Sequence, residues 1–506
     1  MQNKLLLISI GYLLALAPSW CVALQLPSRT QDSGAADDPF RSGQRGGPVL
    51  APQEIPRKAP PPPEDAPQPL PAPTPAQLPP PLTPAAKRSV TTVVRPPQPP
   101  GNFGYNIQLT ADVLTRIAGG DPETKDNGAV PGLLDLRWGG DTLAAGLWQN
   151  GRINLHLMYS FGDSPDKFGK TTLPVSALDD PNRAFNIWEF WYEHYFEYNN
   201  TWLRGGVMDY QRDFYRTPYV NELFLNRSMH IGAETGRLFA RNQPAISIYP
   251  LTGFGILGKT LFSPQIYLLG AIYDGAPGPK SAQYEMPKSD GYFVAGEFGW
   301  QGNAEGALEG SKFALGTWLL FKNIDHWLGH RGDSLEYTDK FIKAPAFSGS
   351  PKRAALTYYA LASLTLGERT HVFLHAAQSD PDINRYALSA SGGIIVQGLV
   401  PGREKDLFGA GIAYNKQSDA FFDVYNTEIG NATFDDKTSI ICPGSDPLDL
   451  AQCAIYHYEL VYELTYSLRF GKWLTLQPNY QWIIQPNTNP YNGNLAIAGL
   501  RAQFNF

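Results

Sequence analysis

The sequence of 506 residues is short of charge, cysteine and long apolar runs. Charged residues make up 17% of the chain, against about 25% in an average soluble domain, which disfavours an ordinary intracellular enzyme. After the first two dozen residues there is no apolar run of about 18 residues, which disfavours a bundle of membrane-spanning helices. The formal net charge is −6, so the chain lacks the basic surplus of a nucleic-acid-binding protein, and we expect no such partner.

The N-terminus has the pattern of a secretory signal. Lys4 precedes an apolar stretch that ends before Pro18, and Cys21-Val22-Ala23 offers small residues at −3 and −1 of a cleavage site. We therefore expect residues 1–23 to be a signal peptide that is cleaved after Ala23. Acylation of Cys21, as in a lipoprotein, is the alternative, but Trp20 stands where that processing needs a small residue.

A proline-rich stretch follows the signal. The region from Pro27 to Gly101 holds 22 of the 44 prolines and no Trp or Tyr. Such a composition cannot bury a core, so residues 24–101 are expected to form an extended, disordered segment. We interpret residues 27–101 as a candidate binding segment for peptidoglycan or a periplasmic protein.

Residues 102–506 alternate apolar and polar side chains with a period of two, which indicates β-strands. From Tyr456 to Phe470 one face carries Tyr, Leu and Phe, and the other carries mainly Glu, Thr, Ser and Arg. A strand of about 15 residues is long for a soluble sheet but suits a tilted strand that crosses a bilayer. The aromatic face is expected to meet lipid and the charged face a wet lumen. A soluble β-sandwich is the disfavoured alternative.

Sixteen strands can be recognised, beginning near residues 104, 131, 152, 186, 201, 253, 265, 291, 312, 355, 370, 386, 405, 456, 473 and 494. The links between them alternate between short ones and long ones such as 162–185, 210–252, 323–354 and 416–455. Outer-membrane barrels combine short periplasmic turns with long outer loops. The sequence thus predicts an all-β fold, a 16-stranded antiparallel transmembrane β-barrel over residues 102–506. We expect it in the outer membrane of a Gram-negative bacterium, with the N-terminal segment in the periplasm.

Two cysteines remain if Cys21 leaves with the signal. Cys442 and Cys453 both fall in the long link 416–455, and an even number in an exported chain predicts one disulfide between them. Two free thiols are the alternative. The eight histidines are dispersed without metal-ligand spacing, so we expect no metal and no cofactor.

Several passages occur in a characteristic order: Thr110-Ala-Asp112-Val-Leu114, Gly132-Leu-Leu-Asp135-Leu136, Asn186-Ile-Trp188-Glu189-Phe-Trp191-Tyr192-Glu193, Arg204-Gly205-Gly206-Val-Met-Asp209, Phe224-Leu225-Asn226, Ala271-Ile272-Tyr273-Asp274-Gly275, Trp473-Leu-Thr-Leu476-Gln477-Pro478, Gln485-Pro486 and Gly499-Leu500-Arg501. Together they resemble the carbohydrate-selective porins of the OprB type over essentially all of 102–506. The resemblance implies a sixteen-stranded barrel through which glucose and related sugars diffuse passively past a constriction. The proline-rich segment departs from the simplest members of that family.

The link 210–252 is the longest, and in diffusion porins of this size a loop after the fifth strand commonly folds into the barrel. A sugar is bound by charge-assisted hydrogen bonds to its hydroxyls and by aromatic faces against its ring. Our pore-lining candidates are the side chains that this link carries or that the alternation turns inward: Arg137, Glu189, Trp191, Glu193, Arg204, Arg212, Asp213 and Glu222. Trp191 is the stacking candidate. The alternative for each charged member is pairing within the wall, without contact to a sugar.

Two other functions are compatible with the sequence. One is an outer-membrane anchor whose tail binds peptidoglycan or a periplasmic partner, and the other is a polysaccharide-export barrel. Deletion of the tail separates the anchor from the porin, because a porin keeps its conductance. An enzyme is disfavoured, since no Ser elbow precedes a helix pattern.

Overall fold

The structure is a computed structural model. It describes residues 103–122, 124–169, 171–180, 183, 185–196, 200–232, 246–277, 284, 286, 291–302, 310–324, 352–381, 384–419, 456–490 and 492–506. The predicted signal peptide, the proline-rich segment and the pair Cys442 and Cys453 lie outside the described residues. Within these ranges no helix is long and apolar enough to cross a membrane.

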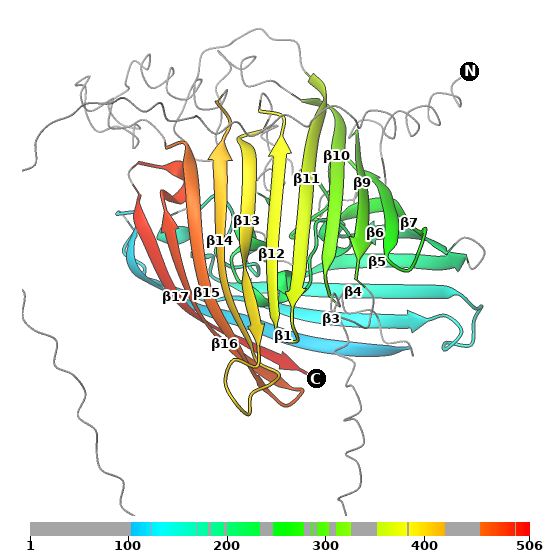
Figure 1. Ribbon diagram of the computed structural model, residues 1–506, viewed down its shortest axis with the longest axis horizontal. Helices are drawn as coiled ribbons and strands as arrows, with labels where there is room; N and C mark the ends of the chain where they lie inside the picture. Colours follow the sequence, from blue (N-terminus) through cyan, green and yellow to red (C-terminus); the bar gives the residue numbers. More distant parts are fainter. Residues whose placement is uncertain are drawn as a thin grey trace, which may run out of the picture. The chain divides into compact units, whose positions relative to one another are not determined.

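The described chain forms one antiparallel sheet of sixteen long strands and the two-residue strand β2, and the sheet closes where β1 pairs with β17 (Figure 1). In chain order the strands are β1 (Gly104–Gly120), β2 (Gly128–Ala129), β3 (Pro131–Asp141), β4 (Gly151–Gly162), β5 (Phe185–Phe196), β6 (Thr201–Met208), β7 (Gly253–Leu261), β8 (Ile266–Asp274), β9 (Tyr292–Gln301), β10 (Lys312–Ile324), β11 (Lys352–Leu366), β12 (Thr370–Ser379), β13 (Tyr386–Gln397), β14 (Leu407–Gln417), β15 (Tyr458–Phe470), β16 (Leu474–Ile484) and β17 (Gly493–Asn505). The predicted fold class is therefore confirmed.

Every predicted strand start lies within three residues of an observed one, the largest difference being 355 against Lys352. Helical turns occur only in links among the described residues. They are η1 (Pro165–Phe168), η3 (Tyr210–Arg212), α2 (Val220–Leu223), α3 (Arg227–His230) and η8 (Pro486–Thr488).

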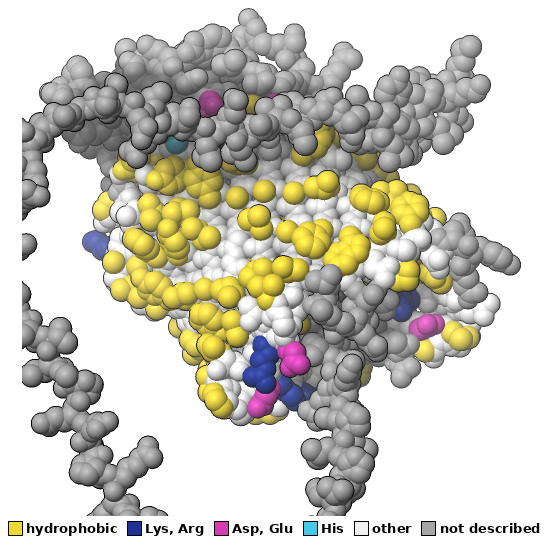
Figure 2. Space-filling view, in the orientation of Figure 1, with side chains coloured by type: hydrophobic (Ala, Val, Ile, Leu, Met, Phe, Trp, Pro, Cys, Tyr) yellow, Lys and Arg dark blue, Asp and Glu magenta, His cyan; other side chains and the backbone are white. Residues whose placement is uncertain are grey.

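The period of two residues separates the inside of the barrel from the outside. On β15, Glu463 is 1% exposed, whereas its neighbour Leu464 is 51% exposed. Successive side chains of a strand point to opposite faces, so outward and inward residues alternate along each strand. Figure 2 shows the result on the visible outer face, which is largely apolar, with charged side chains gathered at its lower end. This distribution suits a wall that faces hydrocarbon.

One strand departs from strict alternation. Strict alternation along β5 would turn Trp188 outward, as it does Phe190, but the structure buries Trp188 at 6% exposure beside Met158 and Tyr249. The cause is a register shift against β4, because Glu189 pairs with His156 while Ile187 pairs with Leu157. Trp188 is the extra residue of this β-bulge, and both it and Glu189 point inward.

Candidate functional site: a paired-charge constriction inside the barrel

The link between β6 and β7 folds into the barrel, as the sequence predicts. The backbone N–H groups of Leu225 and Asn226 donate to the carboxylate of Glu463 on β15, at 2.6 and 3.0 Å. At the other side, the N–H of Tyr215 donates to Glu297 on β9 at 3.1 Å. Because β9 and β15 lie in different sectors of the closed sheet, residues 209–232 cross the lumen.

A second inserted segment was not predicted. In the link between β4 and β5, the N–H of Thr172 donates to Glu459 of β15 at 2.9 Å, and the Ser176 hydroxyl donates to Asp112 of β1 at 2.7 Å. The N–H of Ala177 donates to the carbonyl of Leu225 at 2.7 Å, which joins the two segments. They therefore form one inserted body that narrows the barrel.

Apolar side chains hold part of this body against the wall. The ring of Tyr210 stacks on Phe214 with a centroid distance of 4.9 Å, and it meets Phe293 of β9 edge-on at 5.2 Å. All three side chains are fully buried. This part of the interior is thus packed like a protein core, and water is excluded from it.

Charged side chains lie instead on the inward faces of β3 to β6, in rows set by the strand register. Arg152 of β4 pairs with Glu193 of β5, which pairs with Arg204 of β6. A second row places Arg137 of β3 opposite His156, which is itself opposite Glu189. Directly opposite side chains on one face are close enough to interact. The first row therefore alternates cation, anion and cation over β4 to β6, and the second joins Arg137 to Glu189 through His156 over β3 to β5.

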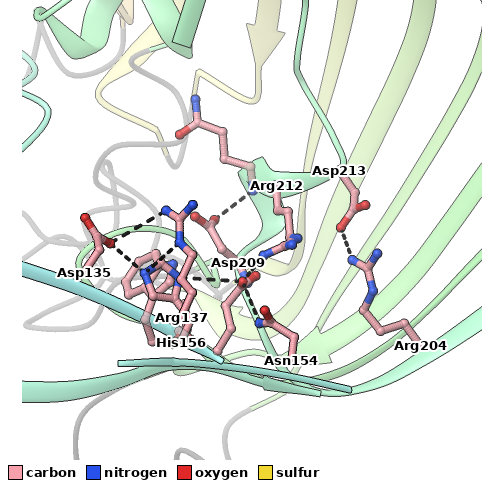
Figure 3. A network of polar contacts seen from close by, with 12 residues as sticks. Asp135, Arg137, Asn154, His156, Arg204, Asp209, Arg212 and Asp213 are labelled. Carbon is pink, nitrogen blue, oxygen red and sulfur yellow. Dashed lines mark hydrogen bonds and ion pairs between the residues drawn. The ribbon is translucent and has the colours of Figure 1, made fainter. Parts of the chain in front are cut away.

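Arg204 ties one row to the inserted segment. Its Nε and Nη2 donate to Glu193 Oε2 at 3.0 and 2.7 Å. Its Nη1 donates to Asp213 Oδ2 at 2.5 Å, as Figure 3 shows. The three side chains are 7%, 11% and 10% exposed, respectively. A guanidinium that holds two carboxylates satisfies charges that would be costly if buried alone.

Glu189 ties the second row to the same segment. It forms an ion pair with Arg212, and it also accepts from the Asn154 amide and from the N–H of Asp209, each at 3.4 Å. The side chain of Glu189 is 1% exposed. Two predicted candidates, Glu189 and Arg212, are thus brought into direct contact.

The outer members of both rows are more open. Asp135 lies 2.6 Å from His156 Nε2 and 3.7 Å from Arg137 Nη2 (Figure 3). The side chains of Arg137 and Arg152 are 30% and 33% exposed, whereas Asp135 is 6% exposed. These two guanidiniums therefore offer donor groups that a solute can reach.

Trp191 lies beneath the network. Its side chain is 3% exposed, and the Cζ atoms of Arg204 and Arg212 lie 4.3 and 5.1 Å from its ring centroid. Guanidinium groups over an indole are stabilised by cation–π attraction. In this geometry Trp191 supports the two cations. Stacking of the Trp191 ring against a sugar stays a prediction, and the burial of the ring disfavours it.

Glu222 contacts none of the other candidates in the described structure. It lies on α2, is 36% exposed and forms its ion pair with Arg216. The structure thus brings together seven of the eight predicted residues and leaves Glu222 on the partly exposed side of the inserted segment.

Sequence reasoning missed the wall carboxylates that hold the inserted body, namely Glu297, Glu459 and Glu463. The sequence does contain a sign of them, because each is an acidic residue on the inward face of a strand. Their partners could not be predicted, because these are backbone N–H groups of distant links.

The carboxyl group of Asp209, next to Glu189, makes the stability of the protein depend on pH. Burial, followed by the nearby charge of Glu189, raises the pKa of the Asp209 carboxyl to about 7. The native state therefore binds a proton that the unfolded chain releases above its ordinary value of 3.8. Stability accordingly falls as the pH rises through the interval between these two values.

We expect Asp209→Asn to flatten this dependence, because the amide still accepts the Gln211 N–H bond of 2.9 Å without a charge. The variant should unfold at a higher temperature than the parent at pH 8, and the difference should shrink to about nothing at pH 4. The midpoint of heat-induced unfolding at both pH values measures this. An equal gain at both values would contradict it.

Comparison with one solved structure supports the same fold. A structure titled as the high-pH form of Pseudomonas putida OprB is 16% identical, covers 80% of this chain and 94% of that chain, and gives a TM-score of 0.66. The low-pH form of the same protein is 12% identical over 80% and 93% of the two chains, with a TM-score of 0.45. No curated protein sequence matches the chain.

A closed sixteen-stranded barrel with a charged constriction and an apolar outer wall defines a transmembrane channel of the porin class. The family model of the carbohydrate-selective porins, OprB family, matches residues 134–506. The chain therefore belongs to that family, and the resemblance found in the sequence is confirmed.

Proposed function

We propose that the protein lets glucose and related small sugars diffuse passively through the barrel. The observation that supports this best is the charge balance of the constriction, in which four guanidiniums are matched by four carboxylates: Arg137, Arg152, Arg204 and Arg212 against Asp135, Glu189, Glu193 and Asp213. A balanced site gives an ion of either sign little advantage, while its donors and acceptors replace the hydration of a neutral, hydroxyl-rich solute.

The inserted body supports a small solute over a polymer. Its two segments bond to each other and to the walls, which leaves less of the lumen for passage. The apolar outer wall supports an outer-membrane location, and we propose that the N-terminal segment lies on the periplasmic side. In this orientation the short turns are periplasmic and the long links face outward.

Single-channel recording in a planar bilayer tests the proposal. The full-length mature protein should give a small, stable conductance that glucose reduces at millimolar concentrations. Arg137→Ala should weaken this block by about tenfold, because a partly exposed charge-assisted donor is lost. Lys405→Ala is the matched control, since it removes one cation from an exposed turn between β13 and β14.

Two outcomes would contradict the proposal. One is the absence of any conductance from a barrel that migrates as folded in a heat-modifiability gel. The other is a pore whose conductance glucose leaves unchanged. An equal loss of block in Arg137→Ala and Lys405→Ala would show that Arg137 acts only through the general field of the pore.

A further inference from the structure

Glu463 on β15 is bonded to the inserted body through both of its oxygens. Oε1 accepts from the N–H of Leu225 and from the Asn479 amide, each at 2.6 Å, and Oε2 accepts from the N–H of Asn226 at 3.0 Å. Leu225 and Asn226 precede α3 directly. One carboxylate thus receives two successive backbone donors at the point where the segment turns.

The surrounding wall is shaped for the same stretch of chain. Gly409 on β14 has no side chain where α2 packs, and a Cβ there would lie 2.7 Å from Leu223 Cδ2. At Gly411 a Cβ would lie 3.0 Å from both Met229 Sδ and Phe224 Cε1. The first distance is shorter than real Cβ contacts and the second is tighter than most of them, so the two glycines let the segment approach the wall closely.

Polar side chains of β16 extend this contact. The Gln481 carbonyl accepts from the Asn226 amide at 2.9 Å, and its own amide donates to the carbonyl of Val175 at 2.8 Å. Gln477 donates to the carbonyl of Leu223. Because Val175 belongs to the other inserted segment, β15 and β16 hold both segments at one place.

Glu463 differs from two other wall carboxylates that contact the body. Glu189 has Arg212 as an ion-pair partner, and Glu297 has Lys312 at 3.0 Å. Glu463 resembles Glu459, which accepts from the backbone N–H groups of Thr172 and Asn487. For Glu463, the described residues contain no cation within ion-pair distance, and its donors are neutral N–H groups. A buried carboxyl without a counter-ion depends on the hydrogen bonds it accepts, so the carboxylate and the inserted segment stabilise each other.

We propose that Glu463 is a positioning residue that fixes α2 and α3 against the wall and so sets the width of the pore. The effect on sugar passage rests on the proposed function, whereas the fixing of the segment does not. Glu463 acts through the backbone of residues 223–229, which connects to Arg212 and Asp213 along the same segment.

The substitution Glu463→Gln tests the fixing. Glutamine keeps the shape, but its NH₂ group would face one of the two N–H donors, so at least one bond is lost. Hydrogen–deuterium exchange with mass spectrometry on the full-length protein in detergent should show at least about tenfold faster exchange in residues 223–229. Ser467→Ala is the control, because Ser467 is an inward, 5% exposed residue of the same strand, and its exchange should match the parent.

Conductance provides the second readout. Glu463→Gln should conduct more than the parent, with noisier openings and weaker block by glucose, while its unfolding midpoint stays close to that of Ser467→Ala. Unchanged exchange in residues 223–229 would overturn the proposal whatever the pore does. Faster exchange with unchanged conductance would overturn the part that concerns pore width. If the parent itself is not blocked by glucose, the proposed function fails, and the exchange result still decides the role of Glu463.

Discussion

Replacing Arg501 by Met should destabilise the barrel by about 3–5 kcal/mol, because it leaves the carboxylate of Asp112 buried without its cation. Arg501 on β17 donates to Asp112 on β1 at 2.6 and 2.8 Å, and the two residues stand directly opposite in the register. Asp112 is fully buried and also accepts from Ser176 at 2.7 Å. The pair therefore joins the first strand, the last strand and an inserted segment.

The double variant Asp112→Asn with Arg501→Met separates charge from packing. It removes both charges, so it should be more stable than Arg501→Met alone, although less stable than the parent. The midpoint of heat-induced unfolding on a mobility-shift gel measures all three proteins. If Arg501→Met unfolds at the same temperature as the parent, the pair does not hold the barrel closed.

Most of the fold could be predicted from the sequence because alternation with a period of two residues indicates a β-strand with two different faces. The strand over Tyr458–Phe470 is nearly the one that the alternation indicates, and its charged face is the buried one. The exception at Trp188 has a physical reason. A β-bulge adds one residue to one strand only, and nothing in the alternation around Trp188 marks which residue is extra.

The candidate site could be predicted only in part. The alternation along the strands placed Glu193 and Arg204 on the inward face. The length of the link 210–252 pointed to Arg212 and Asp213, and Arg204 does contact both Glu193 and Asp213. The alternation tells which face a side chain is on, but not how deeply it is buried. It could not show that Trp191 lies beneath two guanidiniums instead of lining an open path. The insertion of residues 171–180 depends on contacts such as that of Thr172 with Glu459, 287 residues apart, which no local pattern encodes.

The substitution with the largest expected effect on transport is Arg204→Ala. It leaves Glu193 and Asp213 facing each other without the guanidinium that now lies between them, so we expect about 3 kcal/mol of destabilisation. The charge balance of the constriction also becomes negative. The pore should therefore turn cation-selective, which a shift of the reversal potential in a KCl gradient measures. Block by glucose should weaken as well, because Asp213 is released and the segment beside it moves.

Arg204→Lys distinguishes the charge from its geometry. Lysine keeps one positive charge, so the reversal potential should stay near that of the parent. Its ammonium group is a point charge. It cannot reproduce the planar fork with which Arg204 binds Glu193 Oε2 and Asp213 Oδ2 and covers the Trp191 ring. Block by glucose should then weaken without a change in ion selectivity. If Arg204→Lys behaves as the parent in both measurements, net charge alone governs the constriction, and the paired geometry of Glu193, Arg204 and Asp213 has no part in recognising the sugar.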